Sequence, residues 1–203
     1  MKKKISKSLV GLNDLENEVL EISEYMKAKQ KLFDRISDYS REIIRLSAQA
    51  ITYLHNGKQE PSKKALEEAQ KLLRSKEFED ERFSYYTLQA QQEYAEASIF
   101  YAIKNSGKLP GSSAVGVSKE AYLLGLMDTV GELKREVLEE LRRGNVDTAE
   151  YFFSAIRSIY DSTRSVRFAE AVLQGFRKKQ DVARIQLENA GTEILYFRNS
   201  KKL

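Results

Sequence analysis

Two pairs of carboxylates stand at helical spacing inside segments that are otherwise rich in small, apolar and aromatic residues. Glu93 and Glu96 are three residues apart, so they share one face of a helix. Asp128 and Glu132, four residues apart, share a face in the same way. Like charges on a partly apolar face repel each other and are costly to desolvate. A divalent cation would offset both costs, and carboxylate oxygens are ligands that suit Mg²⁺ or Mn²⁺.

A third acidic position, Asp161, follows the apolar-rich stretch 152–159. Carboxylates contributed by several helices are suited to metal-assisted hydrolysis of a phosphodiester. Each signal alone also has an ordinary interpretation, because charged pairs on helices are usually solvated. Glu132 could pair with an arginine of another helix, and Asp161 could pair with Arg157 or Arg164.

The rest of the composition excludes several other classes of chemistry. The chain has no cysteine, so disulfides and thiolate metal sites are excluded. Its one histidine, His55, lies beside a predicted turn, where a structural or exposed role is expected rather than a place in a catalytic triad. Two helical Glu-x-x-His motifs, as in ferritin-like di-iron bundles, are missing. The sequence also contains no P-loop and no glycine-rich dinucleotide turn.

The carboxylates must be positioned by helices, since apolar residues recur at helical spacing and no strand alternation is visible. We expect one all-α domain over residues 1–203, with a basic, flexible stretch at 1–7. The first helix would be about 45 residues and about 70 Å long, so it must pack on partners or stand in an oligomer. The predicted helices are 8–54, 61–73, 80–104, one capped by Ser118 and closed at 144–145, 147–166, and a last one that starts near 168–175 and reaches about 197.

Charge and hydropathy limit the partners and the compartment. The net charge of +4 is a mild lean towards polyanions, so a nucleic-acid surface would have to arise from local segregation of basic residues. No apolar run is long enough to span a membrane. The N-terminus is basic but lacks the apolar stretch of a signal peptide, which makes the cytoplasm the expected compartment.

Several stretches resemble the translin family in type, order and spacing. The resemblance extends over roughly residues 30 to 195. Residues 92–97 (QEYAEA) resemble the Trax branch, the catalytic subunit of the translin–Trax ribonuclease, and Tyr160-Asp161 is similar to the stretch that supplies its catalytic aspartate. The chain lacks the long insertion that animal Trax carries before YLLG. The other matching stretches are 40–55 (SREI…LH), 122–125 (YLLG), 131–133 (GEL), 144–148 (GNVDT) and 187–190 (LENA).

This resemblance implies an antiparallel bundle of six to seven helices with a long first helix, assembled into a homo-oligomeric shell, an octamer. It also implies binding of single-stranded RNA and single-stranded DNA, and Mg²⁺-dependent cleavage of RNA inside the shell. Mn²⁺ is expected to substitute for Mg²⁺.

On this hypothesis Glu93, Glu96 and Asp161 carry the catalysis and hold the metal, with Glu132 or Asp128 as a further ligand. A carboxylate or a metal-bound hydroxide would act as the base. Basic residues would hold the nucleic-acid backbone without reading bases; the candidates are Arg41, Arg45 and Arg135. Tyr86 or Tyr94 would stack on a base or lie in the core.

Two rival classes remain open at this point. One is a catalytically silent shell that binds single-stranded nucleic acid, in which the carboxylates have no catalytic role. The other is a helical scaffold that binds partner helices through its long first helix. Cleavage of RNA with Mg²⁺, binding without cleavage, and absence of binding distinguish the three.

Overall fold

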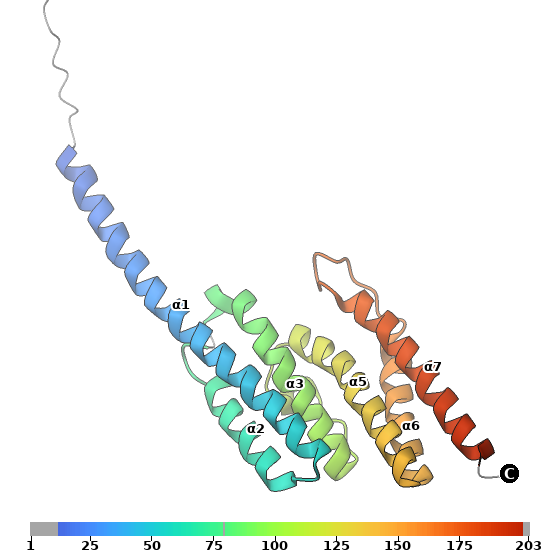
Figure 1. The fold of residues 1–203 in the computed structure, drawn as a ribbon. Coiled ribbons are helices and arrows are strands. Elements are labelled where there is room, and N and C mark those ends of the chain that lie inside the picture. The colour runs from blue at the N-terminus through green and yellow to red at the C-terminus, as the bar shows by residue number, and fades with distance from the viewer. Residues whose placement is uncertain (1–11, 79, 201–203) are drawn as a thin grey trace, which may run out of the picture.

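In the computed structural model, which describes residues 12–78 and 80–200, every regular element is a helix (Figure 1). The all-α prediction is therefore confirmed for these residues. The predicted flexible stretch at 1–7 lies outside them. The elements are α1 (Leu12–His55), α2 (Gln59–Leu73), the 3₁₀ turn η1 (Glu81–Phe83), α3 (Ser84–Ser106), α4 (Ser112–Val115), α5 (Lys119–Arg143), α6 (Val146–Thr163) and α7 (Phe176–Ser200).

The long helix α1 has two halves with different environments. In its C-terminal half, apolar residues at helical spacing are buried against α2 and α3; they include Ile36, Ile43 and Leu54. Its N-terminal half extends beyond the other helices (Figure 1). Large apolar side chains are exposed there: Leu15, Val19, Leu20, Ile22, Tyr25 and Met26. The predicted length of this helix is confirmed, since α1 has 44 residues, and its packing on partners stays a prediction.

Helices α3 and α5 form the centre of the bundle and cross at a glycine. A Cβ atom on Gly125 would lie 2.6 Å from the backbone oxygen of Gln92 and 2.9 Å from the backbone nitrogen of Glu96. Only a residue without a side chain allows this approach. The low helix propensity of Gly125 and Gly131 suggests that another helix or a ligand approaches closely at these positions. The prediction is correct for Gly125, whereas a Cβ atom on Gly131 would meet nothing within 4 Å, and that residue borders a cavity.

Local signals set the ends of α5. The Ser118 hydroxyl accepts a hydrogen bond from the backbone N–H of Ala121 at 3.1 Å, as the predicted N-cap requires. Gly144 ends the helix with φ of +84°, a left-handed conformation that favours glycine. After this turn α6 folds back along α5, and α7 packs against both.

The differences from the predicted boundaries are small and lie between helices. The third predicted helix begins as the 3₁₀ turn η1 before α3, and the predicted loop 105–117 contains the single turn α4. Helix α6 ends at Thr163 rather than near 166, and α7 begins at Phe176, directly after Gly175. None of the helices described is long and apolar enough to cross a membrane.

Candidate metal centre and nucleic-acid interface

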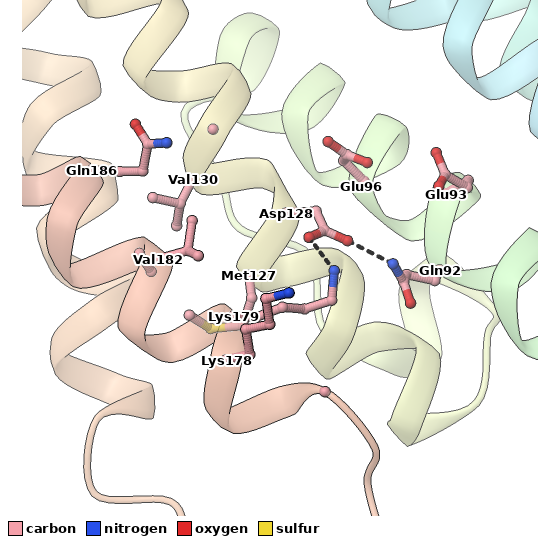
Figure 2. Close-up of a pocket in the computed structure, with 13 residues that line it drawn as sticks. Gln92, Glu93, Glu96, Met127, Asp128, Val130, Lys178, Lys179, Val182 and Gln186 are labelled. Carbon is pink, nitrogen blue, oxygen red and sulfur yellow. Dashed lines mark hydrogen bonds and ion pairs between the residues drawn. The ribbon is translucent and has the colours of Figure 1, made fainter.

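An open cavity of about 570 Å³ lies where α3, α5 and the start of α7 meet (Figure 2). Three of the sequence-predicted carboxylates line it, and two lysines face them from α7. The lining residues are Gln92, Glu93, Glu96, Met127, Asp128, Val130, Gly131, Gly175, Lys178, Lys179, Val182, Ala183 and Gln186.

Glu96 has the most perturbed environment of these acids. Burial raises the pKa of its carboxyl group to about 8, and the negative charges of Asp128, Glu93 and Glu132 add to the effect, while Lys179 opposes it. The group is therefore held among like charges in a partly dry place. Such a carboxyl gains more from a nearby cation than a solvated one does.

Glu93 and Asp128 flank Glu96 in the cavity. Burial raises the pKa of Glu93 above its ordinary value, with a further contribution from the charge of Asp128. Asp128 accepts hydrogen bonds from Gln92 Nε2 at 2.7 Å and from Lys179 Nζ at 2.5 Å (Figure 2). The Lys179 ammonium thus supplies a positive charge where the acids gather.

Whether these residues fit a metal ion depends on the chemistry of the ligands and on their arrangement. All three carboxylates offer hard oxygen ligands, and their mutual repulsion is what a divalent cation relieves, so the chemistry fits Mg²⁺ or Mn²⁺. In the part of the chain that is described, however, no three Asp, Glu or His side chains converge closely enough to hold one ion. Binding would require the side chains to rotate and Lys179 to give up Asp128.

Glu132, the partner of Asp128 in the sequence pattern, is held on the side of α5 that faces α1. Its Oε2 contacts His55 Nε2 at 2.5 Å, and the other ring nitrogen, Nδ1, contacts Glu136 Oε1 at 2.7 Å. Lys104 donates a second hydrogen bond to Glu136 at 2.6 Å. His55 therefore has a structural partner on each ring nitrogen, as the sequence suggested in part. The partner of Glu132 from another helix is this histidine and not an arginine, since Arg135, at 4.0 Å, lies on the same helix as Glu132.

The electrostatics of this cluster follow from its contacts. Burial lowers the pKa of His55, but the hydrogen bonds and charges of Glu132 and Glu136 outweigh that effect, so the net shift is upwards. Burial raises the pKa of Glu136, and the hydrogen bonds from His55 and Lys104 reverse it, so the net shift is downwards. The raised pKa of His55 favours the imidazolium, in which both ring nitrogens can donate, one towards each glutamate.

The structure does not bring Asp161 to the cavity with Glu93 and Glu96. It lies on α6, it is exposed, and Arg164 is its ion-pair partner at 3.7 Å. The reason is helical phase: Ile156 and Ile159 face the core, and a residue two positions after Ile159 points the opposite way. The metal-binding role that the family resemblance gives Asp161 stays a prediction.

The three arginines proposed for nucleic-acid binding are all exposed, and each has an acidic neighbour on its own helix. Arg41 pairs with Asp38, Arg45 forms a two-pronged contact with Glu42 at 2.7 and 2.8 Å, and Arg135 lies near Glu132. None of them lines the cavity. Their role in binding stays a prediction.

Sequence reasoning missed Lys178 and Lys179, which are the basic residues that line the cavity. The signal was present as the run Arg177-Lys178-Lys179 shortly after Gly175. Without the fold, nothing linked this run to the carboxylates of α3 and α5.

The aromatic candidates for base stacking separate clearly. Tyr94 is 4% exposed and belongs to the core. Tyr86 is 54% exposed and Tyr85 is 78% exposed, and their rings meet edge to face at 5.5 Å. Tyr86 stands two helical turns before Glu93 on α3, so the two residues share a face of that helix.

Comparison with known proteins identifies relatives of this chain. The uncharacterized protein MJ0175 of Methanocaldococcus jannaschii is 32% identical over 183 residues, which make up 88% of this chain and 82% of that protein. The structure of AfC3PO in complex with duplex RNA is 28% identical and covers 92% of this chain and 97% of that chain, with a TM-score of 0.78. A crystal structure of AfC3PO covers 94% and 100% at the same identity, with a TM-score of 0.79.

The region that these relatives share contains the bundle core and the cavity. The sequence model of the Translin family matches residues 31–191, which include the cavity-lining carboxylates on α3 and α5 and the lysines on α7. With most of its length matched in sequence and its helices matched in space, this chain belongs to the Translin family.

Proposed function

We propose that this protein binds single-stranded nucleic acid and hydrolyses RNA in the cavity between α3, α5 and α7, as a Trax-like, Mg²⁺-dependent member of its family. The observation that carries the proposal is the set of half-buried carboxylates Glu93, Glu96 and Asp128, placed opposite Lys178 and Lys179 in one open cavity. Acids that hold a cation and lysines that attract phosphate are the two parts that such a reaction needs.

Glu93, Glu96 and Asp128 would hold the cation, with Glu132 as the adjacent carboxylate. When bound, Mg²⁺ or Mn²⁺ supplies Lewis-acid chemistry at the scissile phosphate. The chain's own residues then perform the positioning: Gln92 fixes one oxygen of Asp128, and Lys179 can exchange its contact with Asp128 for a phosphate oxygen.

The nucleic-acid part of the proposal rests on charge and on likeness. Lys178 is exposed beside the acids, and Tyr86 presents an aromatic ring on the same face of α3. AfC3PO, to which this chain is similar along nearly its whole length, was solved with duplex RNA. Contacts to phosphates alone would make binding independent of sequence and strongly dependent on salt.

Assembly into a homo-oligomer, an octamer by the family resemblance, is the third part. The exposed apolar residues on the first half of α1 are a surface that a lone chain leaves in water, as interaction sites do. A shell of such subunits would enclose the RNA around the cavities.

One observation favours a second candidate, a shell that binds nucleic acid without cleaving it. The carboxylates do not converge within the described residues, and the Lys179 ammonium already neutralises Asp128. In this alternative the lysine permanently takes the place of the metal, and addition of Mg²⁺ does not lead to cleavage of RNA.

The test is a cleavage assay on a labelled, unstructured RNA with Mg²⁺, with Mn²⁺ and with EDTA, using the wild type and Glu96→Gln. We expect cleavage with either metal, none in EDTA, and loss of cleavage by at least about a hundredfold in the variant, because its amide can neither carry charge nor bind the cation strongly.

Retention of RNA binding and of the oligomer's mass by Glu96→Gln serves as the control for folding. An RNA that stays intact with Mg²⁺ beside measurable, salt-dependent binding would replace the proposal with the silent shell. Cleavage at the wild-type rate by Glu96→Gln would show that RNA is not hydrolysed in this cavity.

A further inference from the structure

The single histidine of the chain joins the end of α1 to the row of acids on α5. Asp128, Glu132 and Glu136 are spaced four residues apart, so they form one row along α5. The first lines the cavity, and the last is 2% exposed and buried beneath α1. His55, whose side chain is 8% exposed, sits between the second and the third.

The two oxygens of Glu132 have different environments. His55 Nε2 lies 2.5 Å from Oε2, and Arg135 is a distant second contact of the same atom. Among the residues described, Oε1 has no hydrogen-bond partner. Glu132 directly follows the cavity-lining Gly131 and lies one helical turn from Asp128, so its side chain starts beside the cavity.

The imidazole itself is fixed from several sides. Glu136 holds Nδ1 at 2.7 Å and is held in turn by Lys104, whose ammonium also donates to the backbone oxygen of Leu54 at 2.9 Å. The ring packs against Phe100, with centroids 5.1 Å apart. A ring that cannot rotate imposes its Nε2–H direction on Glu132.

We propose that His55 is a positioning residue of the cation site: by holding Oε2 of Glu132, it turns the free oxygen of that carboxylate towards the site and so sets the affinity for a divalent cation. The inference rests on the proposed function and deepens it. Outer hydrogen bonds of this kind typically contribute about 10- to 100-fold in metal affinity.

The two ring nitrogens can be tested separately because amide side chains imitate them one at a time. The Gln amide nitrogen is as many bonds from the backbone as Nε2, and the Asn amide nitrogen is as many as Nδ1. His55→Gln therefore keeps a donor towards Glu132, whereas His55→Asn keeps one only towards Glu136. If the role of His55 were purely structural, the effect of each variant would depend on whether it keeps the contact with the buried Glu136, and not on the contact with Glu132.

The experiment is a calorimetric titration of the purified oligomer with Mn²⁺, together with thermal unfolding. We expect His55→Gln to bind Mn²⁺ within about threefold of the wild type, and His55→Asn to bind it about 10- to 100-fold more weakly. Equal affinities in the two variants, whether high or low, would overturn the inference.

Glu136→Gln is the matched control, since it lies one helical turn from Glu132 and contacts the opposite side of the same ring. Because its amide oxygen still accepts from Nδ1–H and keeps the ring in place, we expect it to lower the unfolding temperature through loss of the buried charge and to leave Mn²⁺ affinity unchanged, while Glu132→Gln lowers the affinity. Equal losses of affinity in both would overturn the inference even if the His55 variants failed to fold. Absence of Mn²⁺ binding by the wild type would instead overturn the proposed function and this inference together.

Discussion

Glu96 shows how one residue can combine opposing demands. Its neighbours on α3 are core residues, Ala95 and Ala97, both with no exposed surface, yet the negative charges of three other acids act on its carboxyl group. A protein that needed only stability would place an apolar residue there. The unfavourable burial of this carboxyl group is therefore best explained by a role in a binding site.

That cost should be visible as a dependence of stability on pH in the metal-free protein. The pKa of Glu96 is about 8 in the folded state against 4.5 for an ordinary glutamate, so between these values the folded protein binds a proton that the unfolded chain releases. Stability contributed by this group is thus complete below about pH 4.5 and declines as the pH rises to about 8.

We expect the unfolding temperature in EDTA to fall over this range more steeply in the wild type than in Glu96→Gln, which has no proton to lose. Differential scanning calorimetry at several pH values measures the two slopes. Parallel slopes would show that Glu96 titrates as an ordinary surface acid.

Sequence reasoning identified the acids but not which of them meet. Glu93 and Glu96 share a helix face by spacing alone, and the structure places both in the cavity together with Asp128. The family resemblance favoured Asp161 over Asp128, although the phase of Ile156 and Ile159 already pointed Asp161 away from the core. Lys179 was missed because a contact across 51 positions of the sequence has no local signal.

At the scale of elements, the crossing of α3 and α5 decides the geometry of the site. Gly125 is the contact point, and the backbone atoms that lie against its missing Cβ belong to Gln92 and Glu96, which both line the cavity. The spacing between the acids of the two helices is therefore set by the absence of one methyl group.

Gly125→Ala should separate the two helices. With a Cβ at 2.6 Å from a backbone oxygen, the backbone must shift, and overpacking of this kind costs about 1–3 kcal/mol of the free energy of unfolding. We expect a lower midpoint in urea and weaker Mn²⁺ binding in the same variant.

Gly131→Ala is the natural control on the same helix. Its Cβ would meet no atom within 4 Å, and replacing a helical glycine with alanine stabilises by about 0.5–1 kcal/mol. A Gly125 variant that unfolds at the wild-type midpoint would contradict the close crossing.

At the scale of the molecule, the helix count and order were predictable because helical periodicity and punctuation are local. Ser118 and Gly144 marked the ends of α5 correctly. The way that α3, α5 and α7 pack to form the cavity was not predictable, since it depends on which faces meet. The length of α1 predicted a need for partners without showing which residues would contact them.

The exposed stripe on α1 should hold the subunits together. We expect Ile22→Glu combined with Met26→Glu to shift the mass in sedimentation experiments from an oligomer towards the 23.3 kDa chain, because it places charges on residues that are 51% and 53% exposed in the lone subunit. Glu21→Gln, on the adjacent polar surface, is the control. An unchanged mass in the double variant would exclude this stripe from the interface.

The projecting half of α1 also links the folding of this chain to its assembly. A helix without tertiary contacts is only marginally stable in water, because nucleation is costly and its backbone hydrogen bonds compete with solvent. The helix–coil equilibrium of residues 14–24, which precede the contacts of Tyr25 with Arg82 and of Lys29 with Phe83, is decided by what covers them. Helix formation in this segment and association of subunits would therefore be a single event. The segment of each subunit would become stably helical only when it packs against a neighbouring subunit.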